Sequence, residues 1–583
     1  MGSVIAHHIV SPLGHNSEEN YLAVKAGKAG IYPYSSGTLQ MPEAFMASIL
    51  LEKNKLWETE NSLLENDFER MAFYSASHAL HEANEKQKDE NIANLRTVFI
   101  LSSTKGDVEG MTPLADSAQR ISSSLGIEVP PIVVCNACIS GLSALILADR
   151  MLAQGKYDRA VVCGCDVPRR FIISGFNSLK ALSLEPCRPF DMERYGLNLG
   201  EAAATIVLGR EPQQQKGCAG NALWKIGKGF IKNDAYHISA PSKIADGLYS
   251  ALTKTLKSFP VNKLAFINAH GTATLFNDQM ESIAIQRAGL KDVPVNALKG
   301  YFGHTLGAAG ILETIMCMMS IDHHTILGTK GFEELGVSGK LDITSQHRPT
   351  DKPAFVKMLS GFGGCNATLL ATKEVSSSSV VAEIRYTKSH LVRITPEGAW
   401  IDGEALSWSA TSVQSNILTA IYKNRVGNYP KFYKMDGLSR LGFVASELLL
   451  QAYGWPENKD CALSGPVDNK KLDTAIVLFN HSSSVDADRK YQATISDKEN
   501  YFPSPSVFVY TLPNIVTGEI AIRNQIYGET SFYILPNKNE LLMNEILKAS
   551  LMDGDTKRIL TGWLNYDDDE HFEAELFMAE KQI

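Results

Sequence analysis

The chain has 583 residues, enough for several domains, and its composition is that of an ordinary globular protein, with 44% hydrophobic and 21% charged residues. The formal net charge of −8 is small for this length and argues against nucleic-acid binding through a basic surface. No segment has the roughly 18–20 consecutive apolar residues that a membrane span needs. The first residues carry no basic region before their apolar stretch, so we expect no secretory signal.

Nine cysteines are an odd number in a long chain and do not form the framework of a disulfide-rich protein. They indicate a reducing compartment, and we expect the cytoplasm. Cys135 and Cys138 form an isolated CxxC pair, without the further ligands that a zinc site needs. We therefore predict no metal site. Cys163 and Cys165 lie in an apolar strand-like segment and are interpreted as core residues.

The first element that carries chemistry surrounds Cys138. Residues 130–137 are rich in β-branched side chains and predict a buried strand, whereas residues 139–155 have apolar residues at helical spacing and end at Gly155. Cys138 therefore lies between a strand and the start of a helix. The free N–H groups and positive end of a helix favour a thiolate and stabilise a developing oxyanion. The position of Cys138 alone does not decide whether it is an inert core residue or a nucleophile.

Two histidines follow, each in a glycine-containing loop between a predicted strand and a predicted helix. His270 comes after the apolar residues 264–267, and His304 lies in a glycine-rich turn after Lys299. A lone histidine at a strand end is commonly structural, but two in equivalent loops indicate a function. The later GFGGCN segment is not a dinucleotide loop, because a strand-like sequence rather than a helix follows it.

Cys138 in NACISG, His270 in NAHGTAT and His304 in KGYFGHTLGAAG together resemble the Cys-His-His signature of β-ketoacyl-acyl carrier protein synthases. Supporting blocks occur in order, from VSPLG near the start to the GFGGCN loop, and span about residues 1–375. The resemblance implies an acyltransferase with an α/β, thiolase-like fold. In that fold two halves, here about 1–210 and 211–375, stack as five αβαβα layers and usually dimerise.

The resemblance also assigns roles to single residues. Cys138 would form the acyl-enzyme, and His270 and His304 would stabilise the enolate left when a malonyl thioester loses carbon dioxide. The supporting residues would be Lys299 paired with Glu313, Phe362 as oxyanion donor and gate, and Thr272 and Thr274 on the pantetheine arm. Acyl carrier protein would bring the acyl and malonyl groups on its phosphopantetheine arm, and no other cofactor is expected. A turn cap is the alternative for the two threonines, and an exposed helix residue is the alternative for Glu313.

The chain departs from the family pattern at three places. Ser360 replaces the first Phe of the family's FGFGGTN, and Cys365 replaces its Thr, which leaves a second, thiolase-like cysteine role open for Cys365. The segment between the predicted strand 97–103 and Cys138 is shorter than in the family. Because this segment contributes to the dimer interface and acyl tunnel of family members, the chain-length preference stays open.

The remaining residues, after a serine run at 376–379, weakly repeat the first half of the synthase. Residues 551–563 align without gaps with residues 152–164, and this offset of 399 carries Cys138 onto Asn537, with no cysteine nearby. We interpret 376–389 as a linker and 390–583 as a thiolase-like half-domain without a nucleophile. It resembles the short chain-length factors found beside aryl polyene ketosynthases.

The predicted function is that of a 3-oxoacyl-acyl carrier protein synthase that elongates a polyene chain of the aryl polyene or flexirubin type. Residues 390–583 would pair with the synthase and set chain length; a decayed duplication that only stabilises the fold is the alternative, and a homodimer is also open. General fatty-acid elongation is the alternative enzyme, and a carrier-protein-binding scaffold is the alternative without catalysis. Arg169, Arg170 and Lys180 are candidates for docking the acidic carrier protein.

Overall fold

The computed structural model describes residues 2–50, 63–87, 95–210, 223–373, 383–407, 416–455, 468–497 and 500–582. Residues 376–382 of the predicted linker lie outside these ranges, and residues 386–389 belong to strand β17 (Tyr386–Thr395). Among the helices in the described ranges, none is long and apolar enough to cross a membrane.

The first half contains a five-stranded sheet whose strands β4 and β6 are buried along their whole length. In spatial order the strands are β1 (Gly2–Val10), β8 (Ala202–Arg210), β6 (Arg159–Asp166), β4 (Thr97–Ser102) and β5 (Ile132–Val134). The pairs β1–β8 and β8–β6 are antiparallel, whereas β6–β4 and β4–β5 are parallel. The outer face is covered by α2 (Asp67–Lys86) and α3 (Leu114–Ser124).

The second half repeats this order. Its strands are β9 (Lys225–Asn233), β16 (Cys365–Thr372), β15 (Ala354–Gly361), β10 (Leu264–Asn268) and β11 (Pro294–Asn296), and β13 (Asp342–Ile343) pairs with the last of them. The first two pairs are again antiparallel and the next two parallel. On its outer side lie α6 (Asp246–Leu256) and α7 (Leu275–Arg287).

Two helices lie between the sheets, and their composition explains why. In α4 (Ser140–Ala153) and α9 (Ala309–Asp322) nearly every residue is buried, whichever way its side chain points. A helix that is apolar all round must be covered on all sides. Both helices contact strands of both sheets, which gives the order helix, sheet, helix, sheet, helix. This arrangement confirms the predicted thiolase-like αβαβα fold.

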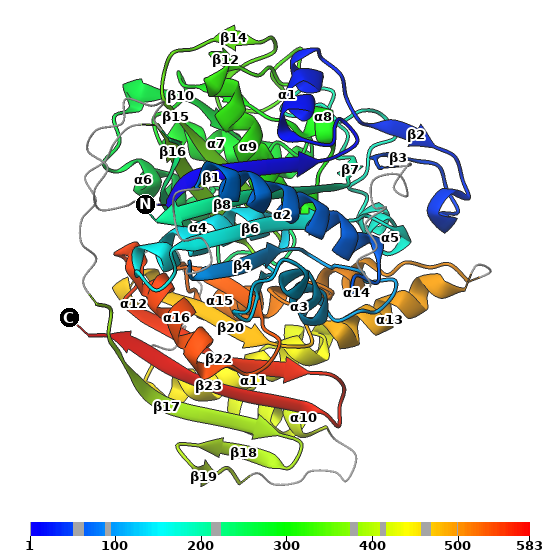
Figure 1. Ribbon diagram of the computed structural model, residues 1–583. Coiled ribbons are helices and arrows are strands. Elements are labelled where there is room, and N and C mark those ends of the chain that lie inside the picture. Colours follow the sequence, from blue (N-terminus) through cyan, green and yellow to red (C-terminus); the bar gives the residue numbers. More distant parts are fainter. Residues whose placement is uncertain are drawn as a thin grey trace.

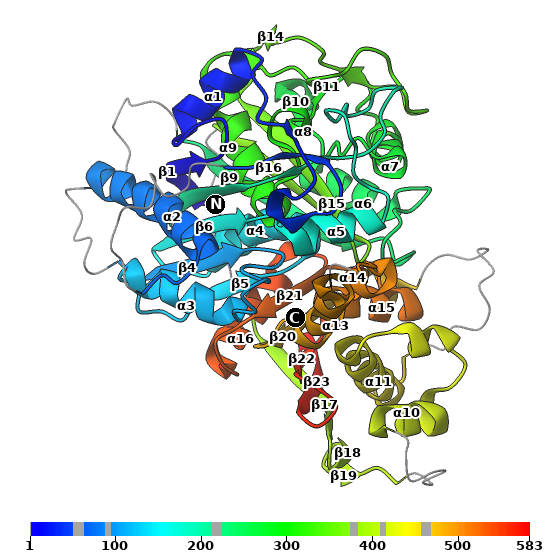
Figure 2. The ribbon, with the colours of Figure 1, turned by 90° about the vertical axis from the view of Figure 1, so that its right-hand side faces the viewer.

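The C-terminal region forms a third sheet with the same order and strand directions. Its five main strands are β17, β23 (Phe572–Lys581), β22 (Arg558–Tyr566), β20 (Thr474–Asn480) and β21 (Thr530–Ile534). The short strands β18 (Gly398–Ile401) and β19 (Glu404–Ala405) extend it beyond β17. One face is covered by α11 (Gly437–Ala452), and α16 (Glu540–Ser550) lies on the other, as Figure 2 shows. The predicted thiolase-like half-domain is therefore present.

The first and third sheets join through their last strands. Strand β5 pairs antiparallel with β21, which places Val134 opposite Tyr533. The side chain of Asn136 extends this junction, because its Oδ1 accepts the N–H of Phe532 (2.7 Å). Helices α4 and α16 also contact each other beside the paired strands. In Figure 1 the C-terminal sheet consequently continues the N-terminal sheet downward, as a partner subunit would across a two-fold axis.

The two joined units differ in the segment after the fourth strand of the sheet. Residues 103–113 connect β4 to α3, whereas the far longer segment 481–514 connects β20 to α15 (Ile515–Asn524). This longer segment contains α13 (Val485–Ser496) and α14 (Pro505–Tyr510), and both contact α5 (Arg170–Ser178) of the first unit. The C-terminal region thus reaches across toward the part of the synthase that holds Cys138.

Candidate active site

Cys138 lies in a tight junction between β5 and α4, as its flanking sequence predicts. A single 3₁₀ turn over Ala137–Ile139 joins the two elements, and Ala137 has a left-handed backbone with φ of 48°. Such a conformation is costly for an L-residue and needs support from its surroundings. The Ser140 hydroxyl provides it by donating to the carbonyl oxygen of Ala137 (2.6 Å) and accepting from the N–H of Asn136 (2.8 Å).

His304 and His270 lie beside this thiol. Nε2 of His304 is 3.1 Å from Sγ of Cys138, and the two imidazole rings meet edge to face with centroids 5.0 Å apart. One polar side-chain atom from each of the three residues lies within 4.8 Å of the others. The N–H of Leu306 donates to Nδ1 of His304 (3.3 Å), so the imidazole proton is on Nε2, which faces the sulfur. The structure therefore brings the three predicted residues together.

Burial determines the protonation of this group. It raises the pKa of the Cys138 thiol to about 12, although the Lys299 ammonium acts in the opposite direction. Burial therefore favours the thiol in the resting side chain and opposes the thiolate that the helix start favours. Burial, followed by the positive charge of Lys299, holds the pKa of His270 and His304 well below the ordinary value, so both imidazoles are neutral.

A buried cluster of charges supports His270. Lys299 Nζ donates to the carbonyl oxygen of His270 (2.7 Å) and to Glu313 (2.8 Å). Glu313 is buried, which excludes the exposed-helix alternative, and its other oxygen is 2.5 Å from Nζ of Lys357. Burial opposes ionisation of Glu313, but the two ammonium groups outweigh it and lower the pKa of the carboxyl. Lys357, which the motif analysis missed, also donates to the carbonyl oxygen of Ala269 (3.1 Å).

The other predicted site residues line the pocket above Cys138. Thr272 and Thr274 do so with their hydroxyl oxygens 2.9 Å apart. Thr274 is the N-cap residue of α7, but its side chain makes no cap hydrogen bond, which argues against the turn-cap alternative. Phe362 lines the pocket from the loop between β15 and β16, where Gly363 and Gly364 have left-handed φ values of 90° and 72°.

The pocket has a volume of about 440 Å³ and opens beside the exposed side chains of Tyr195 and Phe276. Cys365 is not one of its lining residues. The Cys365 thiol instead donates to the carbonyl oxygen of Phe362 (3.3 Å), and burial raises its pKa. This second cysteine therefore contacts the backbone of the loop rather than the pocket, which gives no support to a thiolase-like role.

A smaller cavity of about 30 Å³ also borders Cys138. Part of its wall comes from the C-terminal region: Phe508, Thr511 and Leu512 belong to α14 and the residues that follow it. The ring of Phe508 packs against that of Phe176, with centroids 5.6 Å apart. The C-terminal region therefore forms part of the wall of the cavity next to Cys138.

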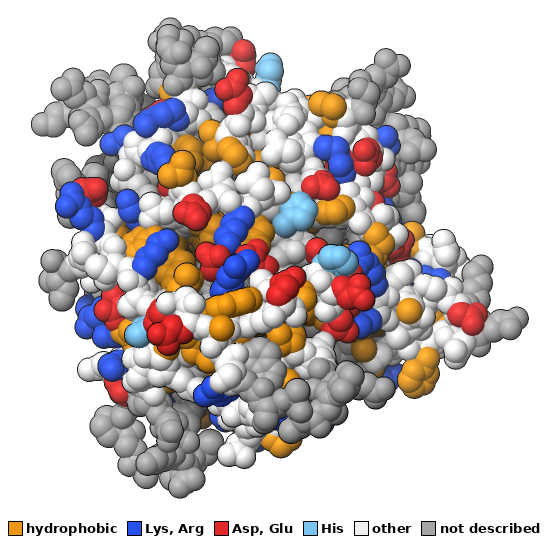
Figure 3. Space-filling view, turned by 90° about the horizontal axis from the view of Figure 1, so that it is seen from below, with side chains coloured by type: hydrophobic (Ala, Val, Ile, Leu, Met, Phe, Trp, Pro, Cys, Tyr) orange, Lys and Arg blue, Asp and Glu red, His pale blue; other side chains and the backbone are white. Residues whose placement is uncertain are grey.

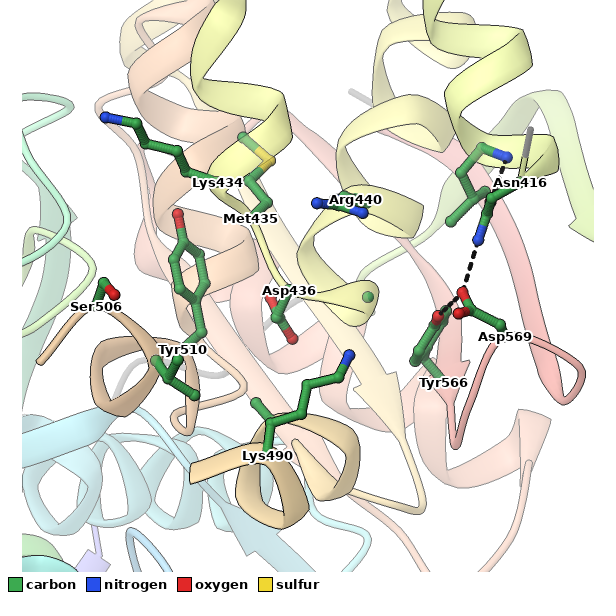
Figure 4. A pocket seen from close by; sticks show the side chains of 14 residues that line it. Asn416, Lys434, Met435, Asp436, Arg440, Lys490, Ser506, Tyr510, Tyr566 and Asp569 are labelled. Atoms are coloured by element: carbon green, nitrogen blue, oxygen red, sulfur yellow. Dashed lines mark hydrogen bonds between the residues drawn. The ribbon is translucent and has the colours of Figure 1, made fainter. Parts of the chain in front are cut away.

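A pocket in the C-terminal region, shown in Figure 4, lacks the cysteine and histidine side chains of the active site. Its volume is about 200 Å³. On one side Asp569 accepts hydrogen bonds from Asn416 and Tyr566, both 2.6 Å long, and Tyr510 and Lys490 lie on the other side. Its lining residues include neither cysteine nor histidine. We therefore assign no thioester chemistry to this pocket.

The basic residues expected to dock a carrier protein differ in their surroundings. Arg169 pairs with Glu201 (3.4 Å), and Arg170 is buried with its guanidinium 5.3 Å from the Tyr501 ring centroid. Arg170 thus faces the C-terminal region and is wrong as a docking residue, whereas Lys180 lines the active-site pocket. On the face seen in Figure 3, Lys and Arg side chains lie among Asp and Glu, so the described residues there form no uniformly basic surface.

Profiles of known families match the first part of the chain. The profile of the "Beta-ketoacyl synthase, N-terminal domain" matches residues 3–214, and that of the corresponding C-terminal domain matches residues 225–333. Nodulation protein E of Rhizobium meliloti (strain 1021) is 31% identical over 291 residues, which are 48% of this chain and 71% of that protein. The 3-oxoacyl-[acyl-carrier-protein] synthase 2 of Coxiella burnetii is 27% identical over 402 residues, covering 63% of this chain and 96% of that protein.

Solved structures share the fold. The ketosynthase ApeO in complex with its chain length factor ApeC from Xenorhabdus doucetiae matches with a TM-score of 0.53 at 27% identity, over 64% of this chain and 97% of that chain. The PfaC keto synthase–chain length factor matches with a TM-score of 0.76 at 12% identity, over 99% of this chain and 78% of that chain, and this likeness is one of fold alone. The chain therefore belongs to the β-ketoacyl synthase family of thiolase-like, acyl-transferring condensing enzymes.

Proposed function

We propose that this chain catalyses decarboxylative condensation of an acyl thioester with malonyl-acyl carrier protein, and that residues 390–583 act as a built-in chain-length factor paired with the synthase. The observation that carries the catalytic part is the 3.1 Å contact between His304 Nε2 and Cys138 Sγ, with His270 alongside. Both substrates would enter on the phosphopantetheine arm of the carrier protein, past Thr272 and Thr274. The proposal needs no other cofactor or metal.

In the first step Cys138 takes the acyl group from the carrier protein. Its sulfur bonds to the thioester carbonyl while the bond to the pantetheine sulfur breaks, so one thioester replaces another. Because burial keeps the resting thiol protonated, its proton leaves during attack and ends on the departing pantetheine sulfur. The backbone N–H groups of Cys138 and Phe362 are the proposed donors to the oxyanion of the tetrahedral intermediate.

In the second step a malonyl thioester loses carbon dioxide. Cleavage of its carbon–carboxylate bond leaves an enolate whose oxygen needs hydrogen-bond donors. His270 and His304 suit this role because they are neutral and can donate without carrying a charge of their own. The enolate carbon then attacks the acyl carbonyl on Cys138, a carbon–carbon bond forms, and the cysteine sulfur leaves and takes up a proton.

The chain-length part of the proposal rests on the cavity of about 30 Å³ beside Cys138. An acyl chain on Cys138 that extends through this cavity meets Phe508, which the C-terminal region contributes. The PfaC keto synthase–chain length factor shares its fold with 99% of this chain, which supports the pairing of the two units. The alternative of a purely structural duplication would leave product length insensitive to Phe508.

We propose an acyl chain of the aryl polyene or flexirubin type, because residues 390–583 resemble the short chain-length factors of such systems. General fatty-acid elongation is the second candidate, favoured by the likeness to 3-oxoacyl-[acyl-carrier-protein] synthase 2 of Coxiella burnetii. Polyenoyl and saturated acyl-carrier proteins of equal chain length separate the two candidates. Faster acylation by the polyenoyl donor supports the first, and faster acylation by the saturated donor supports the second.

Mass spectrometry of the intact protein tests the catalytic proposal. Incubation with acyl-carrier protein should add one acyl group to the wild type and none to the Cys138→Ala variant. Subsequent addition of malonyl-carrier protein should remove the acyl group from the wild type and give a 3-oxoacyl-carrier protein. A wild type that binds carrier protein but accepts no acyl group from any of several donors would support the scaffold alternative instead.

A further inference from the structure

The loop between β15 and β16 approaches the nucleophile closely. A Cβ atom added at Gly361 would lie 3.3 Å from the backbone nitrogen of Cys138, so this part of the loop packs on the start of α4. The next residue, Phe362, is the proposed second oxyanion donor, and two glycines with left-handed backbones follow it. Glycine is free to adopt many conformations, so contacts from outside the loop must select this one.

Those contacts clamp the peptide unit between Phe362 and Gly363 at both ends. The N–H of Gly363 donates to the carbonyl oxygen of Ile238 (2.6 Å), which belongs to the synthase. The carbonyl oxygen of Phe362 accepts from Nδ2 of Asn514 (2.8 Å), which lies 152 residues farther along the chain, in the C-terminal region. A peptide unit is planar, so fixing its N–H and its C=O fixes the whole unit.

The surroundings of Asn514 hold its side chain in place. Asn514 is 2% exposed, and its own carbonyl oxygen accepts from the Thr517 hydroxyl (2.7 Å). Asn514 occupies the N-cap position of α15, yet its side chain makes no cap hydrogen bond and reaches to Phe362 instead. A Cβ atom added at Gly518 would lie 2.7 Å from the carbonyl oxygen of Gly363, so the first turn of α15 lies directly against the loop.

A second contact of the loop also leads to the C-terminal region. Asn233 donates from Nδ2 to the carbonyl oxygen of Gly363 (2.8 Å), and the same nitrogen lies 3.0 Å from the hydroxyl oxygen of Thr530 at the start of β21. Amide side chains therefore hold the carbonyl oxygens of both Phe362 and Gly363: Asn514 belongs to the C-terminal region, and Asn233 contacts Thr530 of that region. The C-terminal region therefore contacts this loop of the synthase at a place separate from the wall of the small cavity beside Cys138.

We propose that Asn514 is a positioning residue for acyl transfer, through which the C-terminal region fixes the loop that carries Phe362. This inference rests on the proposed function, because it takes the Phe362 N–H as an oxyanion donor. Loss of one oxyanion donor costs roughly 10²–10³-fold in rate, and a displacement of about 1 Å can cost about 10²-fold. We expect removal of the Asn514 amide to slow acylation of Cys138 at least ~10-fold, about 1.4 kcal/mol.

The test compares full-length Asn514→Leu with Asn524→Leu. Asn524 is a matched control, because it is a buried asparagine of α15 whose amide contacts Glu447 and Ile520 within the C-terminal region. Two rates are measured on each protein: acylation of Cys138 by acyl-carrier protein, and alkylation of Cys138 by iodoacetamide, which uses no oxyanion donor. Only Asn514→Leu should be acylated more slowly than the wild type, and its rate of alkylation should match that of the wild type. Equal acylation in the two variants, or a parallel loss of acylation and alkylation in Asn514→Leu, would overturn the proposal.

Asn514→Asp and Gly518→Ala provide independent readouts. A protonated aspartic acid can donate to the Phe362 carbonyl oxygen and a carboxylate cannot, so acylation by Asn514→Asp relative to wild type should rise as the pH falls. The added methyl group of Gly518→Ala should displace the loop and reproduce the slow acylation. A pH-independent ratio together with normal acylation in Gly518→Ala would contradict the inference. If the chain-length proposal alone is wrong, the Asn514 variants are still slow while product length does not respond to Phe508→Ala.

Discussion

Val134 and Tyr533 lie opposite each other where β5 and β21 pair antiparallel, and they are 399 positions apart in the chain. The same offset of 399 relates residues 152–164 to residues 551–563. A residue that pairs with its own counterpart lies next to the local two-fold axis of a symmetric pair. The duplicated sequence has therefore folded as two units related in the way that subunits of a symmetric dimer are related, within one chain.

The first prediction concerns the chain cut after residue 373. Without β21, strand β5 keeps β4 as its partner on one side but exposes unpaired N–H and C=O groups on the other, next to the apolar surface of α4. Unprotected edge strands promote aggregation. We expect the truncated protein to elute as large aggregates in size-exclusion chromatography, whereas the full chain elutes as a discrete species. A truncated protein that is monodisperse and can be acylated would show that the C-terminal region is dispensable for folding.

Because we expect truncation to disturb folding, a point variant is the better test of chain-length control. Phe508→Ala removes the ring that narrows the cavity next to Cys138, without touching the paired strands. We expect this variant to release products longer than those of the wild type by one or more two-carbon units, measured by mass spectrometry of the carrier-bound products.

Two further variants control that experiment. Phe502→Ala alters another phenylalanine of the same segment, but its side chain is 78% exposed, so product length should not change. Gly175→Ala instead changes the position of the Phe508 ring, because the added methyl group would lie about 2 Å from it. Its products should differ in length from the wild type. Identical products from all four proteins would favour the purely structural duplication.

Sequence alone predicted the elements whose signals are local. Cys138 was identifiable because hydrophobic periodicity changes there from strand to helix, and His270 and His304 lie in glycine-containing loops between such elements. The repeat was detectable because residues 152–164, which include the start of β6, align without gaps with residues 551–563, which include the start of β22. The symmetric pairing followed from that repeat only as an interpretation, because strand register across an interface is set by residues far apart in the chain.

The residues that sequence missed act through contacts between distant segments. Asn514 directly precedes a helix, so its sequence position predicts an N-cap residue, but its side-chain amide contacts Phe362 instead. Phe508 reads as an ordinary core residue of a short helix. Lys357 left one usable signal, since a lysine in the middle of the apolar strand Ala354–Gly361 must find a buried carboxylate partner. Identifying Glu313 as that partner requires the fold.

His304→Ala should separate the two steps of the reaction. The variant keeps Cys138 and both proposed oxyanion donors, so acyl transfer should persist, but one of the two enolate donors is lost. We expect condensation to fall by roughly 10²-fold, with the acyl-enzyme accumulating in mass spectra after malonyl-carrier protein is added. Wild-type condensation by the variant would contradict the role proposed for His304.

A buried ion pair joins the two units at the small cavity beside Cys138, which Lys105 helps to line. Lys105 is 2.5 Å from Asp488, and both side chains are largely buried. Lys105→Met leaves Asp488 without its partner, so we expect the free energy of unfolding to fall by about 3–5 kcal/mol. The double variant Lys105→Met/Asp488→Leu replaces the pair by apolar side chains and should recover most of that loss. Urea unfolding measures the free energy of unfolding of each variant. If the loss in the double variant equals the sum of the losses in the two single variants, the two side chains are not coupled.

The last prediction concerns the charges that face the histidine pair. Lys299 and Lys357 share the single carboxylate of Glu313, which leaves a net positive charge beneath His270. Glu281 accepts the backbone N–H groups of His270 and Gly271, and burial raises its pKa to about 7. Burial is the main cause of the lowered pKa of both imidazoles, and the two lysines add to it.

Lys357→Met should therefore move the acid limb of the pH–rate profile for malonyl decarboxylation. Removing this positive charge makes protonation of His270 and His304 easier, so their pKa rises and the neutral, donating imidazoles are lost at a higher pH. We expect the midpoint of the acid limb to shift by ~0.5–1 pH unit toward alkaline pH, with little change in rate at pH values above that limb. Lys352→Met is the control, because this lysine, just before β15, donates to the Leu264 carbonyl oxygen away from the histidines. A uniform loss of rate at every pH, or an acid limb that moves to lower pH, would contradict an electrostatic role for Lys357.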